Sequence, residues 1–145
     1  MFRVIEFLRE ARSWRRAGLA LAAGIVAALS MPPLNFWPLL FVAFPVVLLM
    51  LEGIERKLRL QSLFLGWCFG FGYFIVTLHW IGFAFLVDAE SYLWMMPFAV
   101  GGLAAAMAVY WGLASLCVAL SGRQRLPAAL VFAASLAVFE WLRGT

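Results

Sequence analysis

The chain has 145 residues, of which 66% are hydrophobic and 12% are charged, with a formal net charge of +4. This balance excludes an ordinary soluble domain, because a water-soluble core of this size cannot bury so much apolar surface. Lipid is therefore the expected solvent, and backbone groups in lipid must be satisfied within helices or a closed barrel. The apolar runs are continuous rather than alternating, which favours an all-α membrane helical bundle.

The excess of basic residues does not indicate a nucleic-acid partner. The Arg and Lys residues stand between hydrophobic segments instead of along one exposed face. Membrane topology explains this placement, because cytoplasmic loops of membrane proteins carry an excess of Lys and Arg. We therefore expect no nucleic acid among the partners.

The N-terminal segment 1–16, MFRVIEFLREARSWRR, mixes apolar and charged residues at helical spacing. It predicts an amphipathic lead on the cytoplasmic surface of the membrane. A transmembrane domain is expected over 17–145, and its first part is interrupted by MPPLN (Met31 to Asn35), whose two prolines cannot continue a helix. The interruption predicts two short spans, 17–30 and 36–51.

Both spans are shorter than the ~20 residues that a spanning helix prefers. Flanking groups such as Arg16 and Trp37 must therefore reach outward, or the bilayer must thin locally. A cleaved signal peptide is an alternative interpretation of the first run, since Ala28-Leu29-Ser30 resembles a small-residue cleavage site. The Arg-rich lead and the second apolar run favour the two spans.

Three further spans are predicted in the rest of the chain, at 63–87, 94–120 and 128–142. The first of them is interrupted only by His79, and an acidic loop with Asp88 and Glu90 follows it. If the N-terminus lies in the cytoplasm, every basic residue except Arg143 falls on the cytoplasmic side. The positive-inside rule therefore predicts about five spans with a cytoplasmic N-terminus and a periplasmic C-terminus.

The two cysteines, Cys68 and Cys117, lie inside apolar runs without a CxxC or CxxH context. They indicate neither a disulfide framework nor a metal site. A nucleophile and base formed by Cys68 and His79 is excluded within one helix, because eleven residues correspond to ~16 Å of rise. We expect no metal and no cofactor.

The stretch GWCFGFGYF contains Gly66, Gly70 and Gly72. A phosphate-binding loop would have to follow a strand and open a helix at water, so a nucleotide site does not fit an apolar run. Glycines at this spacing are typical of close helix packing in membranes. The same small-residue spacing recurs in the fourth span, where Gly101, Gly102 and Gly112 each stand four residues from an alanine.

The remaining candidate residues are ionisable groups in or beside the spans, namely His79, Glu140 and Arg143. Ionisable residues in a membrane are functional candidates by default. We expect His79 to hydrogen-bond to a neighbouring helix near the outer interface, with a substrate or headgroup contact as the alternative. Glu140 and Arg143 share a helix face and can pair. The pair either lowers the cost of two charges at the membrane boundary or faces an inner cavity and meets a lipid headgroup.

Several stretches occur in a recognisable order: LSMPPLNFWPLLFVAFP, GWCFGFGYF, HWIG, DAE and FEWLRG. In this order, from about Ala17 to Thr145, the chain resembles the N-terminal membrane region of the apolipoprotein N-acyltransferases. His79 departs from the residue expected before the tryptophan, so no family role is carried onto it.

The resemblance implies transfer of an acyl chain from a membrane phospholipid to the N-terminal diacylglyceryl-cysteine of an apolipoprotein, in the bacterial inner membrane. It also implies that a cysteine thiolate, a glutamate base and a lysine perform this chemistry in a nitrilase-like domain. Those catalytic residues are not contained in this chain, whose one lysine is Lys57. We therefore expect a fragment that is inactive alone. The alternative is an independent small membrane protein, such as a transporter subunit or a lipid-binding scaffold.

Overall fold

The computed structural model describes residues 13–32, 34–52, 54, 59–87, 92–121 and 125–144. Every element in these ranges is helical, and no strand occurs among them. The α-helices are α2 (Ser13–Ala28), α3 (Leu40–Glu52), α4 (Arg59–Thr77), α6 (Met96–Ser121) and α7 (Arg125–Gly144). The 3-10 helices are η1 (Trp37–Leu39), η2 (His79–Leu86) and η3 (Leu93–Met95). The all-α prediction is confirmed for the described residues.

Within the described ranges, two helices, Arg59–Thr77 and Leu93–Ser121, are long and apolar enough to cross a membrane. Trp37–Glu52 and Ala128–Leu142 are apolar but shorter. The amphipathic lead lies outside the described residues up to position 12. So do the acidic loop at 88–90 and most of the basic loop residues that define the predicted topology.

The turn after α2 follows from its sequence. The Ser30 hydroxyl donates to the carbonyl of Ala27 at 2.6 Å, and the chain then reaches the proline-containing break. Asn35 adopts a φ of 51°, a left-handed conformation that asparagine tolerates better than most residues. The backbone N–H of Phe36 then donates to the carbonyl of Leu29 at 3.2 Å, which folds the turn back onto the end of α2.

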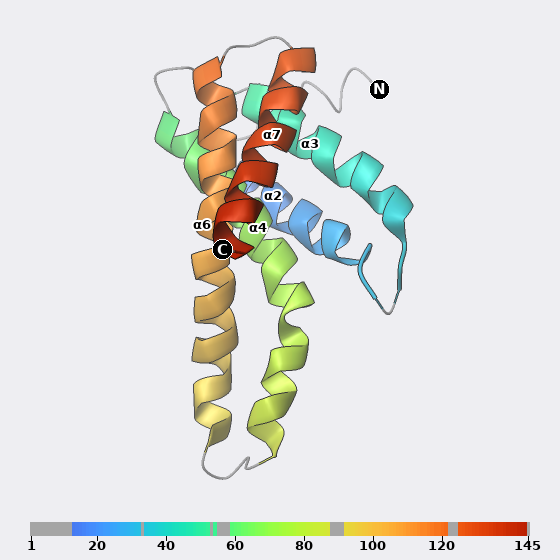
Figure 1. Cartoon of the computed structure of the whole chain (residues 1–145), viewed down its shortest axis with the longest axis vertical. Helices are drawn as coiled ribbons and strands as arrows, with labels where there is room; N and C mark the ends of the chain where they lie inside the picture. The colour runs from blue at the N-terminus through green and yellow to red at the C-terminus, as the bar shows by residue number, and fades with distance from the viewer. Residues whose placement is uncertain are drawn as a thin grey trace.

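Helix α4 is the centre of the bundle, since it packs extensively on both α2 and α6 (Figure 1). Its glycines permit both contacts. A Cβ at Gly70 would lie 2.9 Å from Trp111 Cβ on α6, whereas a Cβ at Gly72 would meet the backbone of Leu21 on α2. Two residues correspond to ~200° around an α-helix, so the two glycines lie on nearly opposite faces. Gly66 faces α6 as well, against Ser115 and Trp111.

Gly24 on α2 lies in the contact between α2 and α4. A Cβ at Gly24 would lie 2.9 Å from the backbone nitrogen of Tyr73 and would also strike the carbonyl oxygen of Phe69. On α6, a Cβ at Gly112 would lie 2.9 Å from the carbonyl oxygen of Leu63. By contrast, Gly101 and Gly102 have nothing within 4 Å of the Cβ position.

The buried side chains form a large cluster contributed by α2, α3, α4 and α6, and a smaller one between α6 and α7. Phe44 of α3 connects them, because its ring lies 5.7 Å from that of Phe69 and 6.1 Å from that of Phe132. The third apolar run is not one continuous α-helix, since α4 ends at Thr77 and η2 begins at His79. Beyond this break, η2 and the start of α6 extend past the C-terminal end of α7 (Figure 1).

Candidate functional site

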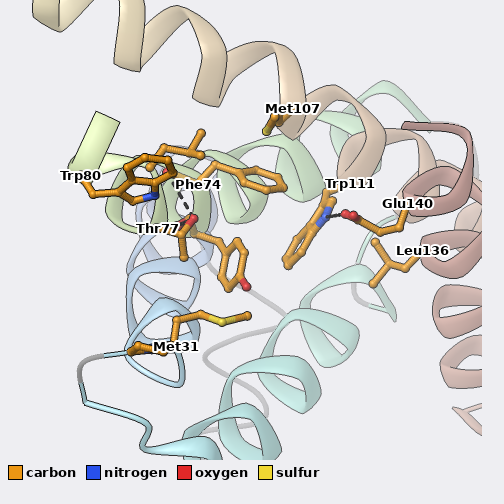
Figure 2. Close-up of a pocket in the computed structure, with 11 residues that line it drawn as sticks. Met31, Phe74, Thr77, Trp80, Met107, Trp111, Leu136 and Glu140 are labelled. Carbon is orange, nitrogen blue, oxygen red and sulfur yellow. Dashed lines mark hydrogen bonds between the residues drawn. The ribbon is translucent and has the colours of Figure 1, made fainter. Parts of the chain in front are cut away.

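A cavity of about 780 Å³ lies between α4, α6, α7 and the turn after α2 (Figure 2). Most of its walls are apolar or aromatic. The lining residues are Met31, Pro32, Tyr73, Phe74, Thr77, Leu78, Trp80, Met107, Trp111, Leu136 and Glu140. Its size and composition match those of small-molecule sites, which are mostly apolar with a few polar groups.

Trp111 forms one wall of this cavity and is almost fully buried. Its ring stacks on Tyr73 with centroids 4.9 Å apart and an interplanar angle of 23°. It also lies 5.2 Å from the ring of Phe69 and 5.5 Å from that of Phe74. Three aromatic residues of α4 thus fix the orientation of one indole on α6.

Glu140 on α7 meets this indole from the other side. Trp111 Nε1 donates a hydrogen bond to Glu140 Oε1 at 3.3 Å, and Figure 2 shows the two side chains pointing at each other. Glu140 is half-buried and lines the cavity, while its neighbour Trp141 is exposed. The Arg143 side chain lies outside the described residues, and so does its predicted pairing with Glu140.

Thr77 stands at the opposite side of the cavity from Glu140, near Trp80 and Met31 (Figure 2). Its hydroxyl lies 3.1 Å from the carbonyl oxygen of Tyr73 and 3.4 Å from that of Phe74. The hydroxyl hydrogen therefore stays within the last turn of α4.

His79 lines a second, smaller cavity of about 520 Å³, together with Ala28, Leu29, Val76 and others. The sequence predicts a bond from this histidine to a neighbouring helix, but the structure shows otherwise. Nδ1 lies 2.5 Å from the carbonyl oxygen of Val76, only three residues earlier, and the side chain is exposed. The break after Thr77 turns the ring back toward its own chain, which explains the difference.

The two cavities adjoin each other, since Met31, Pro32, Thr77 and Trp80 line both. Each cavity contains one candidate residue from the sequence, Glu140 in the larger and His79 in the smaller. The structure therefore does not bring these two residues into one constellation. Cys68 and Cys117 are free thiols, and neither lines either cavity.

Sequence reasoning missed Trp111 and Tyr73, because aromatic residues in an apolar run give no signal of which face meets a cavity. It noticed Met31 and Pro32 only as a helix break. These two residues also line both cavities, because the turn after α2 lies beside them.

Residues 23–145 match the family model described as the apolipoprotein N-acyltransferase N-terminal domain. The chain belongs to the apolipoprotein N-acyltransferase family. The resemblance seen in the ordered motifs is thereby confirmed.

Individual relatives agree with the family match. An apolipoprotein N-acyltransferase of Rhodopseudomonas palustris is 42% identical over 134 residues, which cover 90% of this chain and 25% of that protein. One of Caulobacter vibrioides is 43% identical over 138 residues, covering 92% and 25%, and one of Allorhizobium ampelinum is 41% identical over 138 residues, covering 90% and 26%. The chain thus spans about a quarter of the length of these apolipoprotein N-acyltransferases.

Proposed function

We propose that this chain is the membrane portion of an apolipoprotein N-acyltransferase. In this role it serves an enzyme that transfers an acyl chain from a membrane phospholipid to the N-terminal diacylglyceryl-cysteine of an apolipoprotein. The observation that carries the proposal is the family match over residues 23–145. The names of the relatives support the acceptor and the type of reaction.

The proposed setting is the bacterial inner membrane, crossed about five times with the N-terminus in the cytoplasm and the C-terminus in the periplasm. Two helices of sufficient length and two shorter apolar ones support a membrane location. Large exposed hydrophobic side chains support it too, since Phe41, Phe98 and Leu130 are each about 70% exposed. Such a surface is stable against lipid tails, whereas in water it would promote aggregation.

Within this setting we propose two roles for the residues singled out in the sequence. His79, Glu140 and Arg143 contact lipid or substrate, and the cavities beside His79 and Glu140 support this role for those two. Gly66, Gly70 and Gly72 serve helix packing, and the close approach of α6 and α2 to their Cβ positions supports that role. Close approach through small residues is a main source of helix association in lipid.

The acyl transfer itself requires residues outside this chain. Neither cysteine lines either of the two cavities described above, and the sequence has a single lysine, Lys57. An activated thiol needs a nearby base and a stabiliser for the oxyanion, and these residues supply neither. We therefore expect the purified 145-residue chain to transfer no acyl group in phospholipid vesicles containing a diacylated apolipoprotein.

A chimera tests the proposed function directly. The 145 residues would replace the aligned first quarter of the Rhodopseudomonas palustris relative, and acyl transfer to an apolipoprotein would be measured in membranes. We expect the chimera to be active, while the relative without its first quarter is inactive. A chimera that inserts into the membrane at normal abundance but transfers no acyl group would overturn the proposal.

A further inference from the structure

The helix that begins as α4 changes to 3-10 geometry after Thr77, and η2 begins at His79. The Thr77 hydroxyl lies 3.1 Å from the carbonyl oxygen of Tyr73. His79 Nδ1 lies 2.5 Å from the carbonyl oxygen of Val76. Side chains thus satisfy carbonyl groups where the α-helix ends. At eight residues, η2 is longer than most 3-10 helices, and 3-10 geometry within a long helix often marks a hinge.

The neighbouring helix α6 carries two adjacent glycines, Gly101 and Gly102, within its α-helical range. Packing requires neither of them, because nothing lies within 4 Å of either Cβ position. Glycine leaves the backbone more freedom than alanine does and weakens the interior of a helix. Sharp kinks in helices occur at such pairs of small residues. The two glycines therefore make α6 easy to bend at this point.

The break after α4 and the glycine pair lie at the same level of the two antiparallel helices. A Cβ at Gly70 would lie 3.2 Å from Ala108 Cα, so these two positions face each other across the helix contact. Thr77 lies seven residues after Gly70. Gly101 lies seven residues before Ala108. Both helices thus have a flexible point at one height.

On one side of this level, α4 and α6 are held tightly together. Trp67 Nε1 donates a hydrogen bond to the carbonyl oxygen of Ala105 at 3.0 Å. Phe69, Ala104 and Ala108 are fully buried. The close glycine contacts of α4 described above lie in the same region. This part of the two helices is a rigid section of the bundle.

On the other side, η2 and residues 93–99 form two limbs that we call the arm. The limbs contact each other, since a Cβ at Gly82 would lie 2.5 Å from Met96 Cε. In η2 only Gly82 is buried, and none of residues 93–99 is buried. Figure 1 shows no other described helix beside the far part of the arm. The arm therefore has its own internal contact and little packing on the bundle.

We propose that the arm turns as one unit on a hinge formed by residues 77–79 of one limb and by Gly101 and Gly102 of the other. Because both limbs bend at the same level, the contact between them is kept during the motion. The inference goes beyond the proposed function, since it concerns a motion of the bundle and assumes no reaction.

This motion changes the shape of both cavities. Trp80 lies on the arm side of the hinge and lines both cavities, and so do Met31 and Pro32 of the turn after α2. Trp80 and Met31 are exposed, so the gap between them lies at the surface. When the arm turns, this gap widens or narrows. The hinge thus gates the two cavities together.

The experiment measures distances between pairs of nitroxide labels by double electron–electron resonance, on the 145-residue chain in lipid nanodiscs. The first pair joins Leu86→Cys on the arm to Leu130→Cys on α7. The second joins Leu86→Cys to Met31→Cys in the turn after α2. All three native side chains are exposed. The native free cysteines are removed by Cys68→Ala and Cys117→Ala.

We expect both of these distances to be broadly distributed. Leu86 lies nine residues beyond Thr77, which corresponds to ~18 Å at the rise of a 3-10 helix. A kink of ~20° at the hinge therefore shifts the label by ~6 Å. A reference pair, Leu120→Cys on α6 and Val138→Cys on α7, lies within the bundle and should give one narrow distance.

Glycine substitutions test the hinge itself. Gly101→Ala combined with Gly102→Ala stiffens one limb without overlap, because both Cβ positions are open. We expect this double variant to reduce both arm distances to one narrow population. Gly18→Ala on α2 is the matched control, since its Cβ position is open too, and it should leave the arm distances broad. A narrow reference distance in each variant shows that the bundle is intact.

A narrow distance between the labels at positions 86 and 130 in the chain with both glycines would overturn the hinge. Arm distances that stay equally broad in the double alanine variant, with a narrow reference distance, would overturn it as well. A narrow distance between the labels at positions 86 and 31 would overturn the gating of the cavities. None of these results decides whether the chimera is active, so failure of the hinge and failure of the proposed function are distinguishable.

Discussion

The contact between α4 and α6 predicts a large effect of adding one methyl group at Gly66. A Cβ there would lie 2.5 Å from Ser115 Cβ and 2.7 Å from the carbonyl oxygen of Trp111, both far below ordinary contact distance. These atoms belong to or adjoin the backbone of α6, so rotation of a flexible side chain cannot relieve the overlap. We expect Gly66→Ala to force the helices apart and to lower the free energy of unfolding by about 1–3 kcal/mol.

The control is the same substitution in open space. Gly102 lies on α6 with nothing within 4 Å of its Cβ position, so Gly102→Ala adds no overlap. Alanine is favoured over glycine in a helix by up to ~1 kcal/mol, and Gly102→Ala should therefore be neutral or slightly stabilising. The assay is unfolding of the chain in mixed micelles with increasing sodium dodecyl sulfate, followed by circular dichroism.

A second substitution tests whether overlap with Ser115 causes the loss of stability in Gly66→Ala. Ser115→Gly removes the Oγ and Cβ atoms that overlap most with the added methyl group, but the carbonyl oxygen of Trp111 remains. Combined with Gly66→Ala it should restore part of the lost stability, not all of it. If Gly66→Ala is as stable as Gly102→Ala, the close approach of α4 and α6 is wrong and the reasoning fails.

Three other predictions concern different parts of the bundle. Gly24→Ala should destabilise the contact between α2 and α4 by ~1–3 kcal/mol in the same assay, because the added methyl group meets backbone atoms of Phe69 and Tyr73; an unchanged midpoint would contradict this contact. Trp111→Phe removes the indole N–H that Glu140 accepts and should cost ~1–3 kcal/mol, a loss that calorimetric or chemical unfolding would reveal. A periplasm-specific reporter fused after Thr145 should be active and a cytoplasm-specific one inactive; the reverse result would refute the topology.

Much of the architecture follows from the sequence, because long apolar runs between charged loops leave helices as the available solution in lipid. The boundaries follow less well. Helix α2 includes Arg15 and Arg16, whereas the predicted span begins at position 17. Arginine is a good helix former, so the helix can include these residues although they are not apolar. The change from α4 to η2 falls at His79, the one interruption noted in this run, but a single polar residue does not indicate a change of helix type.

The residues of the candidate site could also be predicted only in part. Glu140 could be singled out from the sequence because a carboxylate in an apolar run is rare. Trp111 could not, although it contacts the rings of Phe44, Phe69, Tyr73 and Phe74 as well as the carboxylate, because the sequence does not say which faces of the helices meet. Gly24 was missed for the same reason, since its partner residues lie on a helix more than forty residues later.

The 3-10 geometry of η2 determines how its side chains are arranged along the exposed surface. A 3-10 helix has about three residues per turn, so residues three apart lie one above another. Trp80, Phe83 and Leu86 therefore form a straight apolar ridge, and each is at least half exposed. In an α-helix of the same sequence Leu86 would be rotated by about 120° away from Trp80. The 3-10 geometry thus aligns three large exposed side chains in one ridge, on a segment that extends past the C-terminal end of α7.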